Sequence, residues 1–335
     1  PPLSPDPQGP SYGRETLEAL RSSVVGRDRE LELVVAALMA GRHLLLEGPP
    51  GTGKSTILRA IASGTSQGFQ FVEGNADLTP ARLAGHFDPA RVLDAGYVDD
   101  IWVDGPLVAA LRDGGLLYIE ELNRIPEDTL NLLVTVMSER ELTVPRLGTI
   151  KAHPSFRLVA AMNPFDAIGT ARVAGAIYDR VCRVSITYQP AADEIDITLA
   201  GAGRPANDEL AKMAPKLVEV VRATRVHPEV VVGSSVRGAI DGLLLIAELA
   251  TLRGVGVDDD GVGLDAALLA LSGRLRVDDA STRTSEEIIT EIWHQITAKR
   301  GQGSSDDTAT DNDAPGADPG KGAGRKAAAP TTIGS

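Results

Sequence analysis

Apolar and polar residues form two kinds of pattern along the first half of the chain. Four short apolar runs have the length of buried strands, at residues 43–47, 69–73, 116–119 and 157–162. Stretches with apolar residues three and four apart predict helices over residues 28–39, 54–63 and 129–138. Strands that alternate with helices in this way are typical of a parallel sheet covered on both faces. The pattern therefore predicts an α/β core.

The strand pattern fades after about Ile186, and helical spacing takes over. It covers residues 193–200, 208–225, 235–252 and 264–271. The two ends differ from both parts, because the first twelve residues hold five of the 21 prolines and the last 35 are mostly Gly, Ala, Ser, Thr, Asp and Pro. We therefore predict a flexible leader (1–19), an α/β core (20–190), a smaller α-helical lid (191–300) and a disordered tail (301–335).

Composition narrows the classes of function. The chain has 335 residues and a net charge of −13, which disfavours nucleic acid as a partner because phosphate backbones are repelled. No apolar run is long enough for a membrane span, so we expect no membrane insertion and a cytoplasmic location. The single cysteine, Cys182, lies in an apolar stretch and is expected to be a buried thiol. The five histidines show no zinc-ligand spacing.

A glycine-rich turn follows the first predicted strand and opens a predicted helix. It matches G-x-x-x-x-G-K-[ST] in full, with Gly48, Pro49, Pro50, Gly51, Thr52, Gly53, Lys54 and Ser55. Backbone N–H groups and the helix N-terminus of such a turn hold phosphate oxygens. Lys54 is expected to reach the β and γ phosphates, and the Ser55 hydroxyl to ligate Mg²⁺. The turn predicts a nucleoside triphosphate site.

Polar side chains end two further predicted strands. Glu120 and Glu121 come after residues 116–119, and Asn163 comes after residues 157–162. We assign Glu120 to the metal, and Glu121, expected on the opposite side of an extended chain, to the activation of water. Asn163 is a candidate to hydrogen-bond the water or the γ phosphate. Read alone, the paired glutamates would be a solvated helix start and Asn163 a turn residue.

These motifs, in this order, resemble the AAA+ ATPases and, within them, the MoxR family. The resemblance runs from Val24-Val25-Gly26-Arg27 through the phosphate loop, Glu120-Glu121-Leu122-Asn123-Arg124, Ala161-Met162-Asn163-Pro164 and Asp179-Arg180 to Ser235-Val236-Arg237. It implies a P-loop NTPase (AAA+) fold, with ATP and Mg²⁺ bound between the core and the lid, and a homo-hexameric ring.

The same resemblance assigns roles by position. The loop 48–55 looks like Walker A, the two glutamates like Walker B, and Asn163 like sensor 1. Arg237 looks like the sensor 2 arginine, with a solvated lid residue as the alternative. Arg180 looks like the arginine finger that acts on the site of the neighbouring subunit. The alternative is an ion pair to Asp179 or a surface charge, and two other arginines, Arg172 and Arg183, lie close to it in sequence.

Some positions depart from the family pattern. Glu120 stands where the first Walker B acid is usually Asp, and Val173-Ala174-Gly175-Ala176 replaces the usual Leu-Pro-Glu-Ala before the arginine. Residues 83–107 fall where the family carries an insertion that touches clients, and Trp102 within it is either a client contact or core packing. Residues 141–154 are expected to form a hairpin.

The resemblance implies an ATP-driven remodeller of a protein client, with chaperone-like maturation or metal-cofactor insertion and a von Willebrand factor A (VWA) domain partner. Two other classes share the nucleotide motifs. A DNA-linked motor or clamp loader would need clustered Lys and Arg, which the sequence lacks. A nucleotide-sensing scaffold without turnover would not need Glu121.

Overall fold

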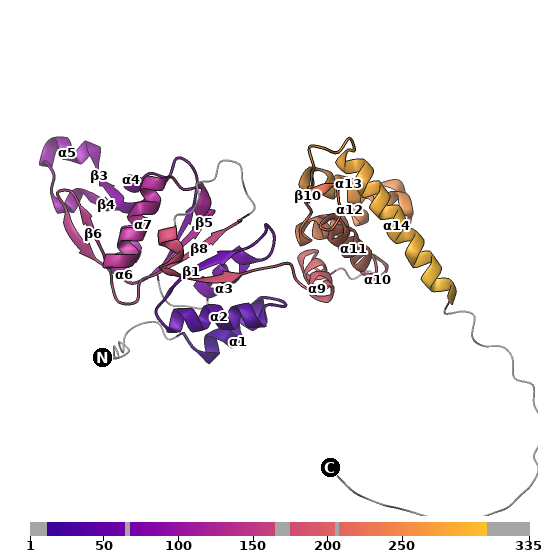
Figure 1. Cartoon of the computed structure of the whole chain (residues 1–335), viewed down its shortest axis with the longest axis horizontal. Helices are drawn as coiled ribbons and strands as arrows, with labels where there is room; N and C mark the ends of the chain where they lie inside the picture. Colours follow the sequence, from indigo (N-terminus) through magenta and orange to yellow (C-terminus); the bar gives the residue numbers. More distant parts are fainter. Residues whose placement is uncertain (1–11, 64–67, 165–174, 205–207, 307–335) are drawn as a thin grey trace, which may run out of the picture.

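The computed structural model describes residues 12–63, 68–164, 175–204 and 208–306, which form an α/β part and a helical part (Figure 1). The main sheet has five parallel strands in the order β2-β5-β8-β1-β9. Its strands are β1 (His43–Glu47), β2 (Phe69–Glu73), β5 (Leu116–Glu120), β8 (Arg157–Met162) and β9 (Val181–Ser185). The helices of this part are α1 (Arg14–Ser23), α2 (Asp28–Met39), α3 (Lys54–Ser63), α4 (Pro80–Ala84), α5 (Pro89–Ala95), α6 (Pro106–Asp113), α7 (Glu127–Glu139) and α8 (Gly175–Tyr178). The predicted α/β class is confirmed.

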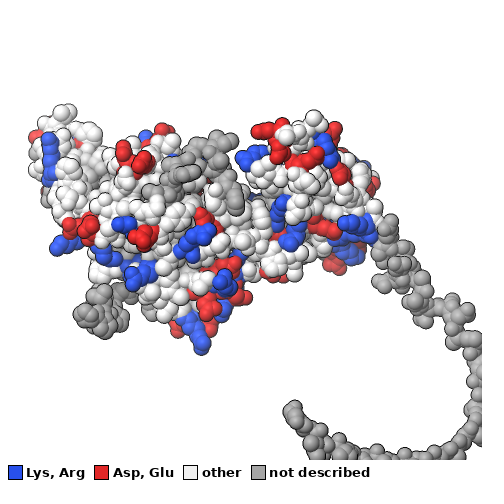
Figure 2. All heavy atoms as spheres, in the orientation of Figure 1, with Lys and Arg blue, Asp and Glu red and all other residues white. Residues whose placement is uncertain are grey.

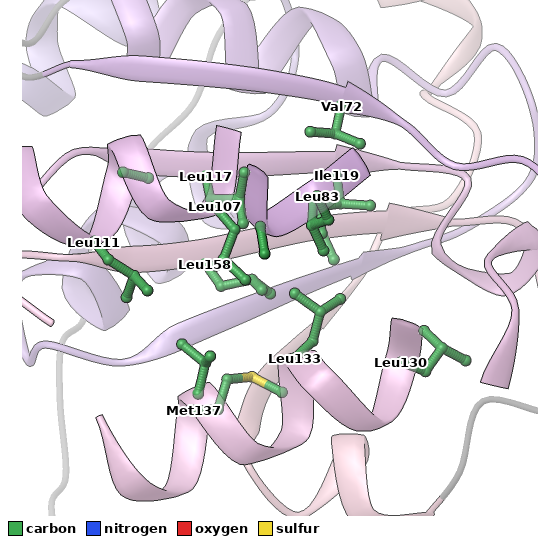
Figure 3. Packing of buried hydrophobic residues seen from close by; sticks show 14 of the residues in the cluster. Val72, Leu83, Leu107, Leu111, Leu117, Ile119, Leu130, Leu133, Met137 and Leu158 are labelled. Atoms are coloured by element: carbon green, nitrogen blue, oxygen red, sulfur yellow. The ribbon is translucent and has the colours of Figure 1, made fainter. Parts of the chain in front are cut away.

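The central strands are apolar throughout because both faces of the sheet are covered. Alternate residues of β1 enter different clusters: Leu45 joins the core beneath α6 and α7, whereas Leu44 and Leu46 join the core beneath α1, α2 and α3. Leu133 and Met137 of α7 belong to the first of these cores (Figure 3). Two cores hold the sheet rigid and fix the edge at which its parallel strands end.

Two small hairpins extend the α/β part. Strands β3 (Gly85–Phe87) and β4 (Trp102–Asp104) pair antiparallel around α5 and a 3₁₀ turn at Asp99–Ile101, and β6 (Glu141–Val144) pairs with β7 (Gly148–Lys151) as expected for residues 141–154. Trp102 packs edge-on against Phe87, with ring centroids 5.0 Å apart, and lies against the main core. This contact favours the packing role for Trp102.

The helical part has a separate core. Its helices are α9 (Ala191–Gly201), α10 (Asp208–Ala211), α11 (Ala214–Thr224), α12 (Val236–Arg253), α13 (Asp260–Leu271) and α14 (Ser285–Asp306). Strands β10 (Val230–Val232) and β11 (Arg276–Val277), which α12 and α13 separate along the chain, pair antiparallel as a small two-stranded sheet. Apolar side chains of α11, α12, α13 and α14 pack around Trp293. The helical second part predicted from the sequence is therefore present, with one small two-stranded sheet that the apolar pattern did not indicate.

Three expectations from the sequence are corrected. Helix α1 begins at Arg14 and buries Leu20, so the leader does not reach residue 19; residues 1–11 lie outside the described residues. Helix α14 continues to Asp306, past the expected start of the tail, and residues 307–335 lie outside the described part. Cys182 is exposed, because β9 is an edge strand with one open side.

Candidate active site

The phosphate loop connects the end of β1 to the start of α3, and its shape depends on glycine. Gly51 and Gly53 have φ of +71° and +87°, in the region that favours glycine. A Cβ at Gly48 would lie 2.0 Å from the carbonyl oxygen of Ile186, so the loop packs against backbone there. The buried guanidinium of Arg27 donates to the carbonyls of Thr52 (2.9 Å) and Thr187 (2.6 Å). Arg27 therefore ties the loop to the segment that leads into the helical part.

Lys54 projects back over its own loop. Its Nζ donates to the carbonyl oxygens of Gly48 (2.7 Å) and Pro49 (2.8 Å). Burial lowers the pKa of Lys54 to about 8, although the carboxylates of Glu121 and Glu120 act in the opposite direction. Both glutamates thus act electrostatically on the ammonium group, as expected of groups that share one site.

Ser55 and Glu120 supply two hard oxygen donors at one point. The hydroxyl of Ser55, in the first turn of α3, donates to Oε1 of Glu120, the last residue of β5. Hydroxyl and carboxylate oxygens are ligands that Mg²⁺ accepts, usually together with waters and phosphate oxygens. Three or more His, Cys, Asp or Glu side chains do not cluster as a metal site anywhere in the described residues. The pair therefore fits a magnesium ion held jointly by protein and nucleotide.

Glu121 does not continue the extended strand, as its sequence position had suggested. Its φ of 55° and ψ of 44° are left-handed, and the chain turns there into a 3₁₀ turn over Leu122–Arg124. Such a backbone is unfavourable for a residue with a Cβ, and strain of this kind gathers at functional sites. The turn also brings Arg124 back to Glu121, with Nε 2.7 Å from Oε2. The direction of the Glu121 carboxylate is therefore set by this turn.

A cavity of about 540 Å³ brings the predicted residues together between the two parts of the chain. Residues 49–56 of the phosphate loop, Glu120, Glu121 and Asn163 line it from the α/β part, and Arg237 lines it from α12. The volume lies in the range of small-molecule sites. The loop and the helical part touch directly, because a Cβ at Gly51 would lie 2.2 Å from Cβ of Ser235.

Asn163 and Arg180 differ in their relation to this cavity. Asn163 follows β8, and its carbonyl oxygen accepts from Nδ2 of the buried Asn123 (3.2 Å). Arg180 is not among the residues that line the cavity. Its guanidinium donates to Oγ of Ser138 (2.5 Å) and to the carbonyl of Ala176 (2.8 Å), and it lies 3.9 Å from Asp179. The described structure thus gives Arg180 no contact with the site of its own chain, and Arg172 lies outside the described residues.

Residues 43–181 match the family model described as an AAA domain of the dynein-related subfamily. The matched segment begins at β1, includes the phosphate loop and both glutamates, and ends at the start of β9. The α/β part has the P-loop AAA+ fold. The fold agrees, since the five-stranded parallel sheet carries the phosphate loop and Glu120 at one edge and a helical part follows it.

The relatives of this chain align with it beyond the residues that match the AAA domain. It is 28% identical over 272 residues to the gas vesicle ATPase GvpN of Ancylobacter aquaticus, covering 74% of this chain and 73% of GvpN. It is 32% identical over 149 residues to a protein of Staphylococcus haemolyticus, covering 44% of this chain and 56% of that protein. A solved structure of a RuvB mutant from Thermotoga maritima matches at 18% identity, with a TM-score of 0.49, over 75% of this chain and 72% of that chain.

The cavity has further lining residues that the sequence did not single out. They come from the segment before α9 and from the lid: Tyr188, Arg225, Val231, Val232, Gly233 and Arg276. The guanidinium of Arg225 lies 3.8 Å over the ring of Tyr188. Residues 188, 225 and 276 lie far apart along the chain and form no local motif, so only the tertiary structure could bring them to one cavity.

The described helices include none that is both long and apolar enough to cross a bilayer. Charged side chains of both signs are interspersed over the face shown in Figure 2, without a continuous basic band.

Proposed function

We propose that this AAA+ chain hydrolyses ATP with Mg²⁺ and uses the energy, as a MoxR-type ring in the cytoplasm, to remodel or mature a client protein. The observation that carries the proposal is the meeting of Lys54, the Ser55–Glu120 pair and Glu121 at one cavity. The GvpN relative is by name an ATPase, which supports turnover over a scaffold that only senses nucleotide.

Each residue has a defined task in this proposal. The N–H groups of residues 48–55 and the Lys54 ammonium hold the triphosphate and offset its charge. Ser55 and Glu120 hold Mg²⁺, which when bound neutralises charge on the β and γ phosphates. Glu121 accepts the proton of the attacking water, and Asn163 orients that water or the γ phosphate.

Two arginines complete the proposed site from outside the α/β core. Arg237 reaches toward the γ phosphate from the lid, which it can do because it lines the cavity. Arg180, which lines no part of its own cavity among the described residues, acts on the site of the adjacent subunit in a homo-hexamer. An arginine given in trans accelerates hydrolysis by about 10³ to 10⁵ in GTPases.

The client-directed part of the proposal rests on the resemblance to the MoxR family. In this proposal the chain acts on a protein client, together with a VWA-domain partner, in chaperone-like maturation or metal-cofactor insertion. The proposal includes no nucleic-acid partner and no membrane insertion. The chain's charge of −13 and the interspersed charges on the visible face support a protein client over a DNA track (Figure 2). ATPase activity that DNA stimulates and purified clients do not would contradict it.

The deciding experiment separates binding from hydrolysis. Glu121→Gln is expected to bind ATP with nearly unchanged affinity and to lose about 10²-fold or more of the turnover, because only the proton acceptor is removed. Lys54→Ala is expected to lose binding itself. Normal hydrolysis by Glu121→Gln would show that the proton acceptor is assigned wrongly.

A mixing experiment tests the ring. Subunits carrying Arg180→Ala and subunits carrying Glu121→Gln are each expected to be inactive alone. Mixed rings contain interfaces that join an intact Glu121 to an intact Arg180, so turnover should recover with a maximum near equal amounts. Absence of recovery at every ratio would contradict a finger in trans.

A further inference from the structure

The start of α12, which carries Arg237, is not fixed by its own capping group. Ser235 is the N-cap residue, and its side chain makes no capping hydrogen bond. Arg237 is exposed at the second position of the helix and lines the cavity. Its position therefore depends on how the backbone just before α12 is held.

The end of α11 holds that backbone from both sides. The N–H of Ser234 donates to Oγ1 of Thr224 (3.0 Å), and the carbonyl of Ser234 accepts from Nε of Arg225 (2.7 Å). Thr224 is 0% exposed and Ser234 1% exposed, so neither peptide group has water as a substitute. Loss of either partner leaves a buried backbone group unpaired.

The approach of the two segments is close enough to require glycine. A Cβ at Gly233 would lie 2.6 Å from Cα and 2.7 Å from the backbone nitrogen of Arg225. Such distances to backbone atoms cannot be relieved by rotating a side chain. The loop before α12 is thus packed directly on the last residues of α11.

Arg225 is in turn fixed by groups outside the helical core. Its Nη1 lies 2.8 Å from Oε1 of Glu194 on α9, and its guanidinium stacks on Tyr188. Glu194 is 2% exposed and also pairs with Arg222, whose Nη1 lies 2.8 Å from Oε2. Of these two arginines, only Arg225 hydrogen-bonds to the loop before α12 in the described structure, through the carbonyl of Ser234. The buried carboxylate therefore anchors the guanidinium that holds Ser234.

From this geometry we propose that Thr224 and Arg225 are positioning residues for Arg237: they hold the Ser234 peptide groups and so aim the first turn of α12 into the nucleotide cavity. The inference rests on the proposed function, because it explains how the lid arginine of that ATPase is placed. Neither residue needs to touch the γ phosphate for this role.

The experiment is a double-mutant cycle on steady-state ATP hydrolysis. Thr224→Val keeps the shape of the side chain and removes the acceptor for the Ser234 N–H, and it is expected to lower kcat about three- to tenfold. Thr224→Ser keeps the hydroxyl and should restore most of the wild-type kcat. Arg225→Lys should behave like Thr224→Val, since one ammonium cannot replace both Nε and Nη1.

The decisive measurement repeats Thr224→Val in an Arg237→Ala background. If Thr224 acts through Arg237, it has no further effect on kcat there. The matched control is Arg222→Gln, which loses a bond to the same Glu194 but leaves Ser234 bonded, and it should stay within about twofold of wild-type kcat. Thermal unfolding confirms that each variant is folded.

Each outcome bears on the inference. An equal loss in both backgrounds would make Thr224 a structural residue only and overturn it. Wild-type kcat in Arg237→Ala would also overturn it, because there would be nothing to position. Wild-type protein without any ATP turnover would instead refute the proposed function, and that result is read before any variant is compared. If Thr224→Val does not fold, Arg225→Lys carries the same cycle.

Discussion

Raising the pH from 7 to 9 is expected to weaken nucleotide binding about tenfold through Lys54 alone. Burial lowers the pKa of this ammonium group to about 8, and the positive charge of Arg237 acts in the same direction. Phosphate oxygens bind the charged form of the lysine far better than the neutral form. With a second pKa of about 6, the phosphate is about nine-tenths ionised at pH 7 and nearly fully ionised from pH 8 upward. Tight binding therefore requires a protonated Lys54, and the affinity falls as the pH rises through 8.

The magnitude follows from the fraction of protonated lysine. With a pKa of about 8, the charged fraction falls from about nine-tenths at pH 7 to one-half at pH 8 and about one-tenth at pH 9. Bound phosphates restore the pKa of the lysine to its ordinary range, so binding at pH 8 takes up about half a proton. At pH 7 the lysine takes up only about one-tenth of a proton, and the phosphate releases about as much, so the net uptake is expected to be close to zero.

Isothermal titration with a non-hydrolysable ATP analogue measures both quantities. The dissociation constant is followed from pH 7 to 9, and proton uptake is obtained from buffers of different ionisation enthalpy. Lys54→Arg is the matched control, because a guanidinium stays charged throughout, so its affinity should be independent of pH over this range. Arg237→Ala should move the midpoint to higher pH, and Glu121→Gln to lower pH.

Two results would refute this account of the site. An affinity that changes less than about twofold between pH 7 and 9 would mean that Lys54 is not neutralised in this range. An equal dependence on pH in the wild type and in Lys54→Arg would mean that another group titrates.

Three further predictions concern other parts of the chain. Gly51→Ala should weaken ATP binding about tenfold or more, because it places a Cβ against Ser235 at a φ of +71°, and adding Ser235→Gly should recover part of the affinity. Normal ATP binding by Gly51→Ala in titration calorimetry would contradict this. Cys182 should react stoichiometrically with a thiol reagent in the folded chain, and protection until unfolding would disprove its exposure. Trp293→Ala should lower the free energy of unfolding of the lid by about 3–5 kcal/mol in denaturant titration, because the ring is fully buried and its Nε1 donates to Asp260 (2.9 Å). Trp293→Phe should lower it less, and a decrease below about 1 kcal/mol for Trp293→Ala would contradict the observed packing.

Much of the α/β core could be predicted from local pattern. The strands at 43–47, 69–73 and 157–162 begin and end in the structure at the residues that the apolar runs indicated. Strands buried on both faces carry continuous apolar residues, and that signal does not depend on which strands become neighbours. The phosphate loop could also be predicted from the sequence, because its glycines and Lys54 act within a single turn between β1 and α3.

Expectations failed where position in the sheet or a distant contact decided the outcome. Cys182 lies in an apolar run, yet it is exposed, because β9 pairs only with β1 and forms an edge of the sheet. Glu121 turns into a left-handed conformation instead of extending β5, and it pairs with Arg124. The local pattern of apolar and polar residues predicts neither the order in which the strands pair nor the turn at Glu121.

The sequence by itself determined the chemistry of the chain: a phosphate loop, two adjacent acids and a strand-ending amide, each set by a few neighbouring residues. Only the tertiary structure decided what surrounds them. Tyr188, Arg225 and Arg276 reach the same cavity from separate segments, and Ser234 is held by residues ten and nine positions earlier. Local pattern records burial and backbone preference, whereas the aim of a lid arginine depends on packing between elements, which arises only when the chain is folded.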